Sequence, residues 1–222
     1  MDFEKIRAVI FDLDGTLLDT LNDLKNGVNA ALRKNGLPER TAHEIRMFVG
    51  NGLGMLVARA IPQGSSNPLY PQILTDTRKF YAEKSNETTK PYTGIPELLR
   101  ALETHGIGLA VVSNKPDAQV KSLCRIYFPT ISVAVGQREG FRLKPEPDSV
   151  LESIRLLGCK PEEVVYAGDS EVDIQTARNA GIPCISVLWG FRSREQLLQA
   201  GAECLAETPA EMLNFFSPFF VY

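Results

Sequence analysis

The sequence has few of the residues that mark several protein classes. Its 222 residues include only two histidines and four cysteines, Cys124, Cys159, Cys184 and Cys204, with no C-x-x-C pair, so we expect reduced thiols and no zinc site. The net charge is only -3, and this near balance gives no broad positive field for nucleic acid or anionic membranes. No apolar run is long enough to span a bilayer, and no signal-peptide pattern opens the chain. We therefore expect a cytoplasmic protein with neither nucleic acid nor membrane as a partner.

What the sequence does contain is a regular alternation of strand-like and helix-like segments. The Val- and Ile-rich runs lie at residues 8–11, 108–112, 131–135, 164–167 and 184–188. The helical patterns between them lie at residues 96–104, 116–127, 148–157 and 171–180. Parallel strands need a long crossover connection, usually a helix. The alternation therefore predicts an α/β fold, with a Rossmann-like parallel sheet and helices on both faces.

Residues 20–89 break this alternation. They hold no clear Val/Ile strand and instead show helical patches at 21–34, 42–49, 53–61 and 69–84. Thr41 and Glu44 have the spacing of a capping box at the start of the second patch. We expect an all-helical insertion at 18–89, which divides the α/β core into two pieces, residues 1–17 and 90–222.

Two carboxylates follow the first predicted strand, in the run Asp12-Leu13-Asp14-Gly15. Residues two apart on an extended backbone project to the same side, so we expect the two side chains to lie close together. A hard cation with oxygen ligands, or a shared proton, would relieve their repulsion. Asp-Gly after a strand is also a common turn signal, so this pair alone does not establish a site.

Three more polar segments lie beyond predicted strands. They contain Ser113 with Asn114, Lys144, and Asp169 with Asp173. Ligands of an open parallel sheet bind outside the carboxyl ends of its strands, where these groups would converge. Separately, each has a structural interpretation: Ser113 as a turn residue, Lys144 as a surface lysine and Asp173 as part of a helix cap.

Together these groups suit phosphoryl transfer. One carboxylate can attack phosphorus to form an aspartyl-phosphate, and a second carboxyl can act as general acid and then as base. The acidic cluster alone would repel phosphate, so a lysine and a divalent cation are needed to balance the charge. A small phosphorylated metabolite is the partner that this chemistry predicts.

The same segments resemble, in order, the four signature motifs of the haloacid dehalogenase-like hydrolase superfamily. The motifs are FDLDGTLLDT at 11–20, VSNK at 112–115, KPEP at 144–147 and GDSEVD at 168–173. The insertion after the first motif is similar to the helical cap of that superfamily. The resemblance implies that Asp12 is the nucleophile and Asp14 the acid/base, with phosphate bound by the residues Thr16, Ser113, Asn114 and Lys144.

The resemblance also implies a magnesium site. Its ligands would be Asp12, the Asp14 carbonyl and Asp169, with Asp173 in the outer shell or bound through water. Whether Mn²⁺ or Co²⁺ can replace Mg²⁺ stays open, because oxygen-rich sites discriminate weakly between such ions.

Within the superfamily, segments 49–52, 91–95, 113–115 and 188–191 are similar to the phosphoglycolate phosphatase group. This implies a magnesium-dependent phosphatase, with 2-phosphoglycolate as the favoured substrate. Arg46, Asn51 and Arg59 in the insertion are candidates to meet the substrate's carboxylate. Pyrophosphatases, sugar-phosphate phosphatases and phosphomutases share all four motifs, and a catalytically silent binding or regulatory protein is the alternative of another class.

The oligomeric state stays open between a monomer and a homodimer. The apolar run at 215–222 either docks onto the core of its own chain or contacts a second subunit.

Overall fold

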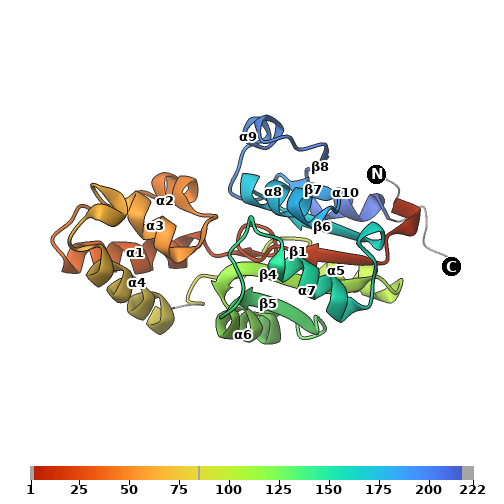
Figure 1. Ribbon diagram of the computed structural model, residues 1–222, viewed down its shortest axis with the longest axis horizontal. Helices are drawn as coiled ribbons and strands as arrows, with labels where there is room; N and C mark the ends of the chain where they lie inside the picture. The colour runs from red at the N-terminus through yellow and green to blue at the C-terminus, as the bar shows by residue number, and fades with distance from the viewer. Residues whose placement is uncertain (1–2, 85, 217–222) are drawn as a thin grey trace. The chain divides into compact units, whose positions relative to one another are not determined.

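The computed structural model describes residues 3–84 and 86–216 (Figure 1). The chain divides into two compact units: one takes in the described residues up to Leu18 and those from Pro91 onward, and the other is Asp19–Lys90. None of the described helices combines the length and the apolar character needed to cross a membrane.

The first unit is built on a six-stranded parallel sheet with the order β5-β4-β1-β6-β7-β8 (Figure 1). The strands are β1 (Ala8–Phe11), β4 (Gly108–Pro116), β5 (Val133–Gln137), β6 (Val164–Gly168), β7 (Cys184–Val187) and β8 (Cys204–Ala206). The α/β class and the parallel sheet that the sequence predicts are confirmed. The strand β8 was not predicted, because a three-residue strand carries too little hydrophobic pattern.

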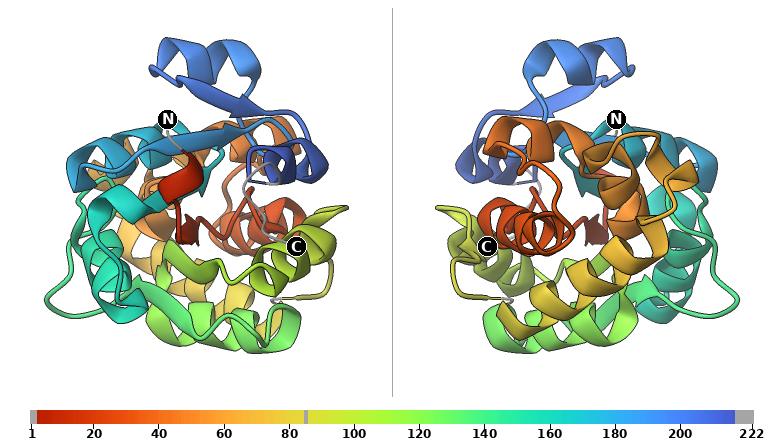
Figure 2. Two further views of the ribbon diagram at one scale, coloured as in Figure 1. Left: turned by 90° about the vertical axis from the view of Figure 1, so that its right-hand side faces the viewer. Right: turned by 90° about the vertical axis from the view of Figure 1, so that its left-hand side faces the viewer.

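Helices cover both faces of this sheet (Figure 2). One face packs against α5 (Ile95–Thr104), α6 (Asp117–Tyr127) and α10 (Pro209–Asn214), and the other against α7 (Asp148–Leu157) and α8 (Glu171–Ala180). The remaining helix is α9 (Arg194–Gln199), and short 3-10 turns lie at Phe3–Lys5 and Pro161–Glu163. The six-residue helices α9 and α10 were not predicted.

Strand β1 shows why the sheet lies inside the unit. All four of its side chains are buried. Val9 and Phe11 pack into the cluster on one face, whereas Ala8 and Ile10 pack into the cluster on the other. Side chains alternate along a strand, and a strand buried on both faces must therefore be apolar throughout.

The strand order places a topological switch at β1. From β1 the chain builds β4 and β5 on one side and then β6, β7 and β8 on the other. Adjacent connections therefore leave the sheet in opposite directions, which opens a crevice at the carboxyl end of β1.

The second unit is helical. It contains α1 (Leu21–Lys34), α2 (Ala42–Phe48), α3 (Gly52–Ala60) and α4 (Tyr70–Lys84), with a short 3-10 turn at Gly64–Ser66. The capping box that Thr41 and Glu44 predict is present at α2. Two two-residue strands that the sequence did not predict, β2 (Leu18–Asp19) and β3 (Lys90–Pro91), pair at the two connections between the units.

The apolar C-terminal run begins within the described residues. Phe216 is buried in the core of the first unit, and its ring meets Phe3 edge-on with 5.3 Å between the centroids. Phe215 stacks on the same ring. These two residues therefore pack on their own chain, and residues 217–222 of the run lie outside the described residues.

Candidate active site

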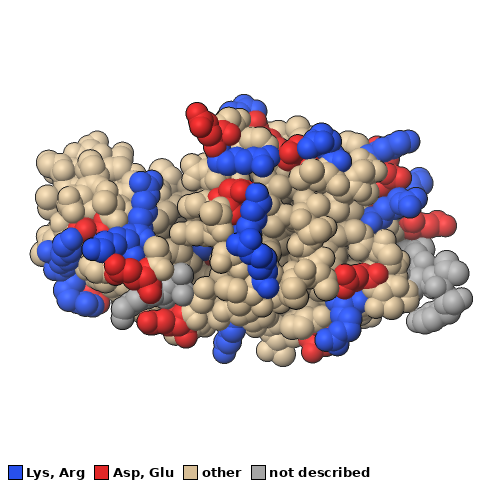
Figure 3. All heavy atoms as spheres, turned by 90° about the horizontal axis from the view of Figure 1, so that it is seen from below, with Lys and Arg blue, Asp and Glu red and all other residues tan. Residues whose placement is uncertain are grey.

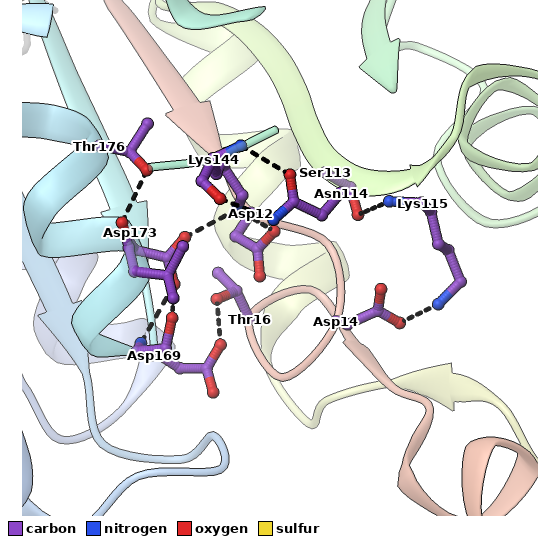
Figure 4. Close-up of polar contacts among 12 residues, drawn as sticks. Asp12, Asp14, Thr16, Ser113, Asn114, Lys115, Lys144, Asp169, Asp173 and Thr176 are labelled. Carbon is purple, nitrogen blue, oxygen red and sulfur yellow. Dashed lines mark hydrogen bonds and ion pairs between the residues drawn. The ribbon is translucent and has the colours of Figure 1, made fainter. Parts of the chain in front are cut away.

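Four segments bring their polar side chains to the carboxyl end of β1 (Figure 4). Asp12 follows β1, and its N–H donates to Ala167 O of β6 at 2.8 Å. Asp169 follows β6, Asp173 lies in the first turn of α8, and Lys144 comes from the loop between β5 and α7. Residues up to 161 positions apart in the sequence are therefore joined by the topology of the sheet.

Lys144 lies at the centre of the group. Its Nζ donates to Asp12 Oδ1 at 2.7 Å, to Asp173 Oδ1 at 2.8 Å and to the Tyr166 hydroxyl at 2.9 Å. The side chain is buried. Burial alone would lower the pKa of Lys144, but the carboxylates of Asp12 and Asp173 outweigh it and raise the pKa well above its usual value. The two carboxylates therefore favour the charged form of Lys144.

The side-chain amide of Asn114 binds both the main-chain oxygen and the main-chain N–H of Lys144. Its Nδ2 donates to Lys144 O at 3.1 Å, and its Oδ1 accepts from Lys144 N at 2.8 Å. Ser113 lies next to it and accepts a hydrogen bond from Lys115 N at 3.2 Å. Asn114 thus fixes the loop that carries the central lysine.

Both residues lie within β4, which runs to Pro116, and not beyond the strand as the sequence predicted. The pairing of β4 with β5 shifts register between Val112 and Pro116. The polar residues of this stretch carry no apolar signal, so the hydrophobic pattern ends before the strand does.

Three buried carboxylates form a cluster. One oxygen each from Asp12, Asp169 and Asp173 lies within 4.8 Å of the others. Burial and the charges of Asp173 and Asp14 raise the pKa of Asp12 to about 7, although Lys144 opposes the shift. Burial and the same kind of repulsion raise the pKa of Asp169 well above its usual value. A divalent cation with oxygen ligands would relieve this excess of negative charge, so the residues fit a metal site.

Asp169 is fixed by two hydrogen bonds. Thr16 Oγ1 donates to Asp169 Oδ1 at 3.0 Å, and Phe191 N donates to Oδ2 at 2.7 Å. The indole Nε1 of Trp189 in turn donates to Thr16 O at 2.8 Å. The residues after β7 therefore help to orient a carboxylate that follows β6.

Glycines allow this close approach. A Cβ added to Gly190 would lie 2.3 Å from Asp169 Cβ and 2.4 Å from Gly15 O. A Cβ added to Gly15 would lie 2.4 Å from Asp169 Oδ2, and the φ of Gly15 is +88°. Any larger residue would displace Asp169.

Both oxygens of Asp173 already accept hydrogen bonds. Oδ1 accepts from Lys144 and from the Tyr166 hydroxyl at 3.1 Å, whereas Oδ2 accepts from Ser170 N at 3.1 Å and Ser170 Oγ at 2.6 Å. The helix-cap contact and the site contact are therefore made by one side chain. Because both of its oxygens are engaged in this way, Asp173 is better placed to hold Lys144 than to bind a metal ion directly.

Asp14 has a different partner. Its carboxylate is not part of the three-carboxylate cluster, and its Oδ1 accepts from Lys115 Nζ at 2.5 Å. In Figure 4 this pair lies to the right of the Lys144 group. Neither Lys115 nor Tyr166 was assigned a role from the sequence. Lys115 adjoins Ser113 and Asn114, which could have drawn attention to it, whereas Tyr166 is hidden in an apolar strand.

Of the candidates in the helical unit, Arg46 and Arg59 are exposed and Asn51 is half-buried, and Arg59 and Asn51 bond to each other. Arg59 Nη2 donates to Asn51 Oδ1 at 2.8 Å, and its Nη1 donates to Phe48 O at 2.7 Å. Arg59 therefore ties the end of α2 to the start of α3. Arg46 lies on α2 with an exposed side chain.

Charges on the face shown in Figure 3 are mixed. Basic and acidic side chains are interspersed there, with no broad field of one sign. Nonspecific binding to nucleic acid uses a continuous basic surface, which this face does not present.

Known proteins are similar to this chain in sequence and in fold. The haloacid dehalogenase-like hydrolase family matches residues 9–187. A phosphoglycolate phosphatase from Aquifex aeolicus is 34% identical over 191 residues, which cover 84% of this chain and 86% of that protein. The N-acetylmuramic acid 6-phosphate phosphatase of Pseudomonas aeruginosa is 31% identical over 213 residues, which cover 95% of this chain and 94% of that protein.

A solved structure is also similar. It comes from Lactobacillus delbrueckii subsp. bulgaricus, and its protein carries the provisional name phosphoglycolate phosphatase. The TM-score is 0.91 at 35% identity, and the match covers 95% of this chain and 98% of that one.

Proposed function

The chain belongs to the haloacid dehalogenase-like hydrolase family, and we propose that it is a magnesium-dependent phosphatase that hydrolyses a small phosphate monoester, 2-phosphoglycolate above others, through an aspartyl-phosphate. The observation that carries this proposal is the position of Asp12 at the switch point of the sheet. Its Oδ1 is held by Lys144, and no described residue donates a hydrogen bond to its Oδ2. The second oxygen is therefore available for attack on phosphorus.

In the first half of the proposed reaction, Asp12 Oδ2 attacks the phosphorus atom. The bond from phosphorus to the ester oxygen breaks, and the departing oxygen takes a proton from the Asp14 carboxyl. An acyl phosphate on Asp12 and a free alcohol result. In the second half, Asp14 accepts a proton from a water molecule whose oxygen attacks the same phosphorus, which releases inorganic phosphate and restores Asp12.

Lys144 and Ser113 supply the proposed phosphate contacts. The Lys144 ammonium is fixed beside Asp12, where it can neutralise oxygens of the transferring group. Asn114 and Thr16 were expected to contact phosphate as well. The Asn114 side chain bonds to the main chain of Lys144, and the Thr16 hydroxyl bonds to Asp169. We therefore propose that Asn114 positions Lys144 and that Thr16 positions Asp169.

Asp12, the Asp14 carbonyl and Asp169 are the proposed magnesium ligands. When bound, Mg²⁺ would lower the repulsion between the Asp12 carboxylate and the phosphate and stabilise charge on the phosphoryl oxygens. The Asp173 carboxylate pairs with Lys144 at 2.8 Å and holds it in place. This ligand set is supported by the buried cluster of three carboxylates.

The helical segment 18–89 is the proposed cap, with Asn51 and Arg59 as candidates for substrate selection. Their mutual hydrogen bond supports a role in shaping the connection between α2 and α3. Arg46 has an exposed side chain and stays the candidate for direct contact with a substrate carboxylate.

A sugar-phosphate phosphatase is the second candidate function. It is favoured by one observation, the 31% identity to the N-acetylmuramic acid 6-phosphate phosphatase over nearly the whole chain. The catalytic residues proposed above serve both functions, because the fold and its chemistry do not by themselves fix the substrate.

Two measurements test the proposed function. Asp12→Asn should abolish magnesium-dependent release of phosphate and formation of the phosphoenzyme, while circular dichroism stays that of the wild type. A panel of phosphorylated metabolites, ranked by kcat/KM with magnesium and with a chelator, should place 2-phosphoglycolate first. Turnover retained by a clean Asp12→Asn preparation refutes the nucleophile, and a flat ranking or a preference for sugar phosphates refutes the substrate.

A further inference from the structure

Lys115 is a second buried lysine at the site, and the reaction steps above give it no role. Its side chain is only 8% exposed, and its Nζ lies 2.5 Å from Asp14 Oδ1. An ammonium that leaves water needs an anionic partner close by, since burial without one costs several kcal/mol. The position of Lys115 at the end of β4 therefore depends on an anion beside it.

The partner of Lys115 fixes where its charge acts. In the proposed reaction Asp14 gives its proton to the ester oxygen of the leaving group, so that oxygen must come within hydrogen-bond distance of the Asp14 carboxyl. The Lys115 ammonium contacts the same carboxyl. It therefore stands on the leaving-group side of the phosphorus, whereas Lys144 stands beside Asp12.

The chemistry of 2-phosphoglycolate matches this arrangement. One methylene group separates its ester oxygen from its carboxylate. When the ester oxygen lies at Asp14, the side chain that binds the carboxylate must therefore be a neighbour of Asp14. A substrate carboxylate that arrives while the Asp14 carboxyl is ionised would be repelled by it at close range. A cation between the two anions turns this repulsion into attraction.

We propose that Lys115 is the specificity residue that binds a carboxylate on the leaving group of the substrate, exchanging part of its contact with Asp14 for this ion pair. The inference rests on the proposed phosphatase function and names a group that selects the substrate. It also places carboxylate recognition in the α/β unit, on the strand that carries Ser113 and Asn114. Selection then begins in the same unit that holds the nucleophile.

The test compares two esters of equal chain length. 2-Phosphoglycolate carries the carboxylate, and 2-hydroxyethyl phosphate carries a neutral hydroxyl in its place. Lys115→Met keeps the length and apolar stem of the side chain and removes the charge. It should lower kcat/KM for 2-phosphoglycolate about 100-fold more than for 2-hydroxyethyl phosphate, the size expected when one partner of a desolvated ion pair is lost.

Three variants sharpen the comparison. Lys115→Arg keeps the charge and should retain most of the preference for 2-phosphoglycolate. Lys115→Gln keeps a hydrogen-bond donor for Asp14 without the charge, and it should lose the preference even if Lys115→Met does not fold. Lys121→Met removes an exposed lysine of α6 that pairs with Asp117, and it should change neither ester's kinetics.

The ratio of the two kcat/KM values separates the outcomes. Any effect of Lys115 on Asp14 alone acts on both esters and cancels in the ratio. Equal losses for both esters in Lys115→Met or Lys115→Gln would therefore overturn the inference and leave the phosphatase function intact. A wild type without metal-dependent turnover of any phosphate ester would refute the proposed function itself, and the inference with it.

Discussion

The buried nucleophile is expected to destabilise the metal-free protein. Asp12 has a pKa of about 7 in the folded chain against 3.8 for an unperturbed side chain, because burial and neighbouring carboxylates disfavour its charge more than Lys144 favours it. Below pH 3.8 the carboxyl is protonated in both the folded and the unfolded state. As the pH rises from there to about 7, the unfolded chain releases the proton first, so the free energy of unfolding falls.

The size of this effect follows from the two pKa values. A shift in the pKa of Asp12 from 3.8 to about 7 lowers the free energy of unfolding by about 4 kcal/mol at pH 8 and by about 2 kcal/mol at pH 5. Asp12→Asn carries a neutral amide of nearly the same shape at every pH. In metal-free buffer the variant should therefore be more stable than the wild type by up to these amounts, and the difference should vanish near pH 3.

The assay is urea unfolding in a chelator, followed by the fluorescence of the single tryptophan. Trp189 bonds to Thr16 O within the site, so its emission reports on the α/β unit. Magnesium should then raise the free energy of unfolding of the wild type at pH 8 more than that of Asp12→Asn, because the ion binds the folded state through this carboxylate. A variant less stable than the wild type at pH 8, or a difference that does not change with pH, would refute the reasoning.

Two further predictions concern packing and acid stability. Gly190→Ala should cost about 1–3 kcal/mol of stability and raise the magnesium concentration for half-maximal activity, because the new Cβ falls 2.3 Å from Asp169 Cβ; thermal unfolding and a metal titration check this, and unchanged metal dependence would contradict it. In the helical unit, hydrogen bonds from Lys34, Asn35 and Gln72 lower the pKa of Asp76 to about 2. The stability from Asp76 is complete above its unfolded pKa of 3.8 and is lost as the pH falls through about 2. Asp76→Asn should therefore flatten the acid dependence of unfolding over this range, as followed by circular dichroism, and an unaltered slope would argue against it.

Several features were predictable because they depend on local sequence. The strand β1 and the helices α7 and α8 have the bounds that hydrophobic periodicity and the glycines at their ends predict. The family membership implied by the four ordered motifs is confirmed. The elements that were missed, β8 above all, are too short for a periodic pattern to exceed chance.

Local sequence also named Asp12, Lys144 and Asp169 as candidates, since polar residues beyond buried strands must meet at one edge of a parallel sheet. Their partners were not predictable in the same way. The contact of Asn114 with phosphate stays a prediction, whereas the hydrogen bonds of its amide to the main chain of Lys144, 30 residues away, were not expected. Tyr166 looks like one more apolar strand residue until its hydroxyl is found on the Lys144 ammonium.

By itself, the sequence determined how the longer strands and helices alternate along the chain and which chemical groups are available at the edge of the sheet, because hydrophobic period and residue type act over a few positions. Only the tertiary structure decided which carboxylate each lysine neutralises. Lys144 joins Asp12 to Asp173, while Lys115 meets Asp14, 101 residues away. Ion pairs of this kind depend on distances of a few ångströms between distant segments, and packing of the sheet and its loops sets those distances.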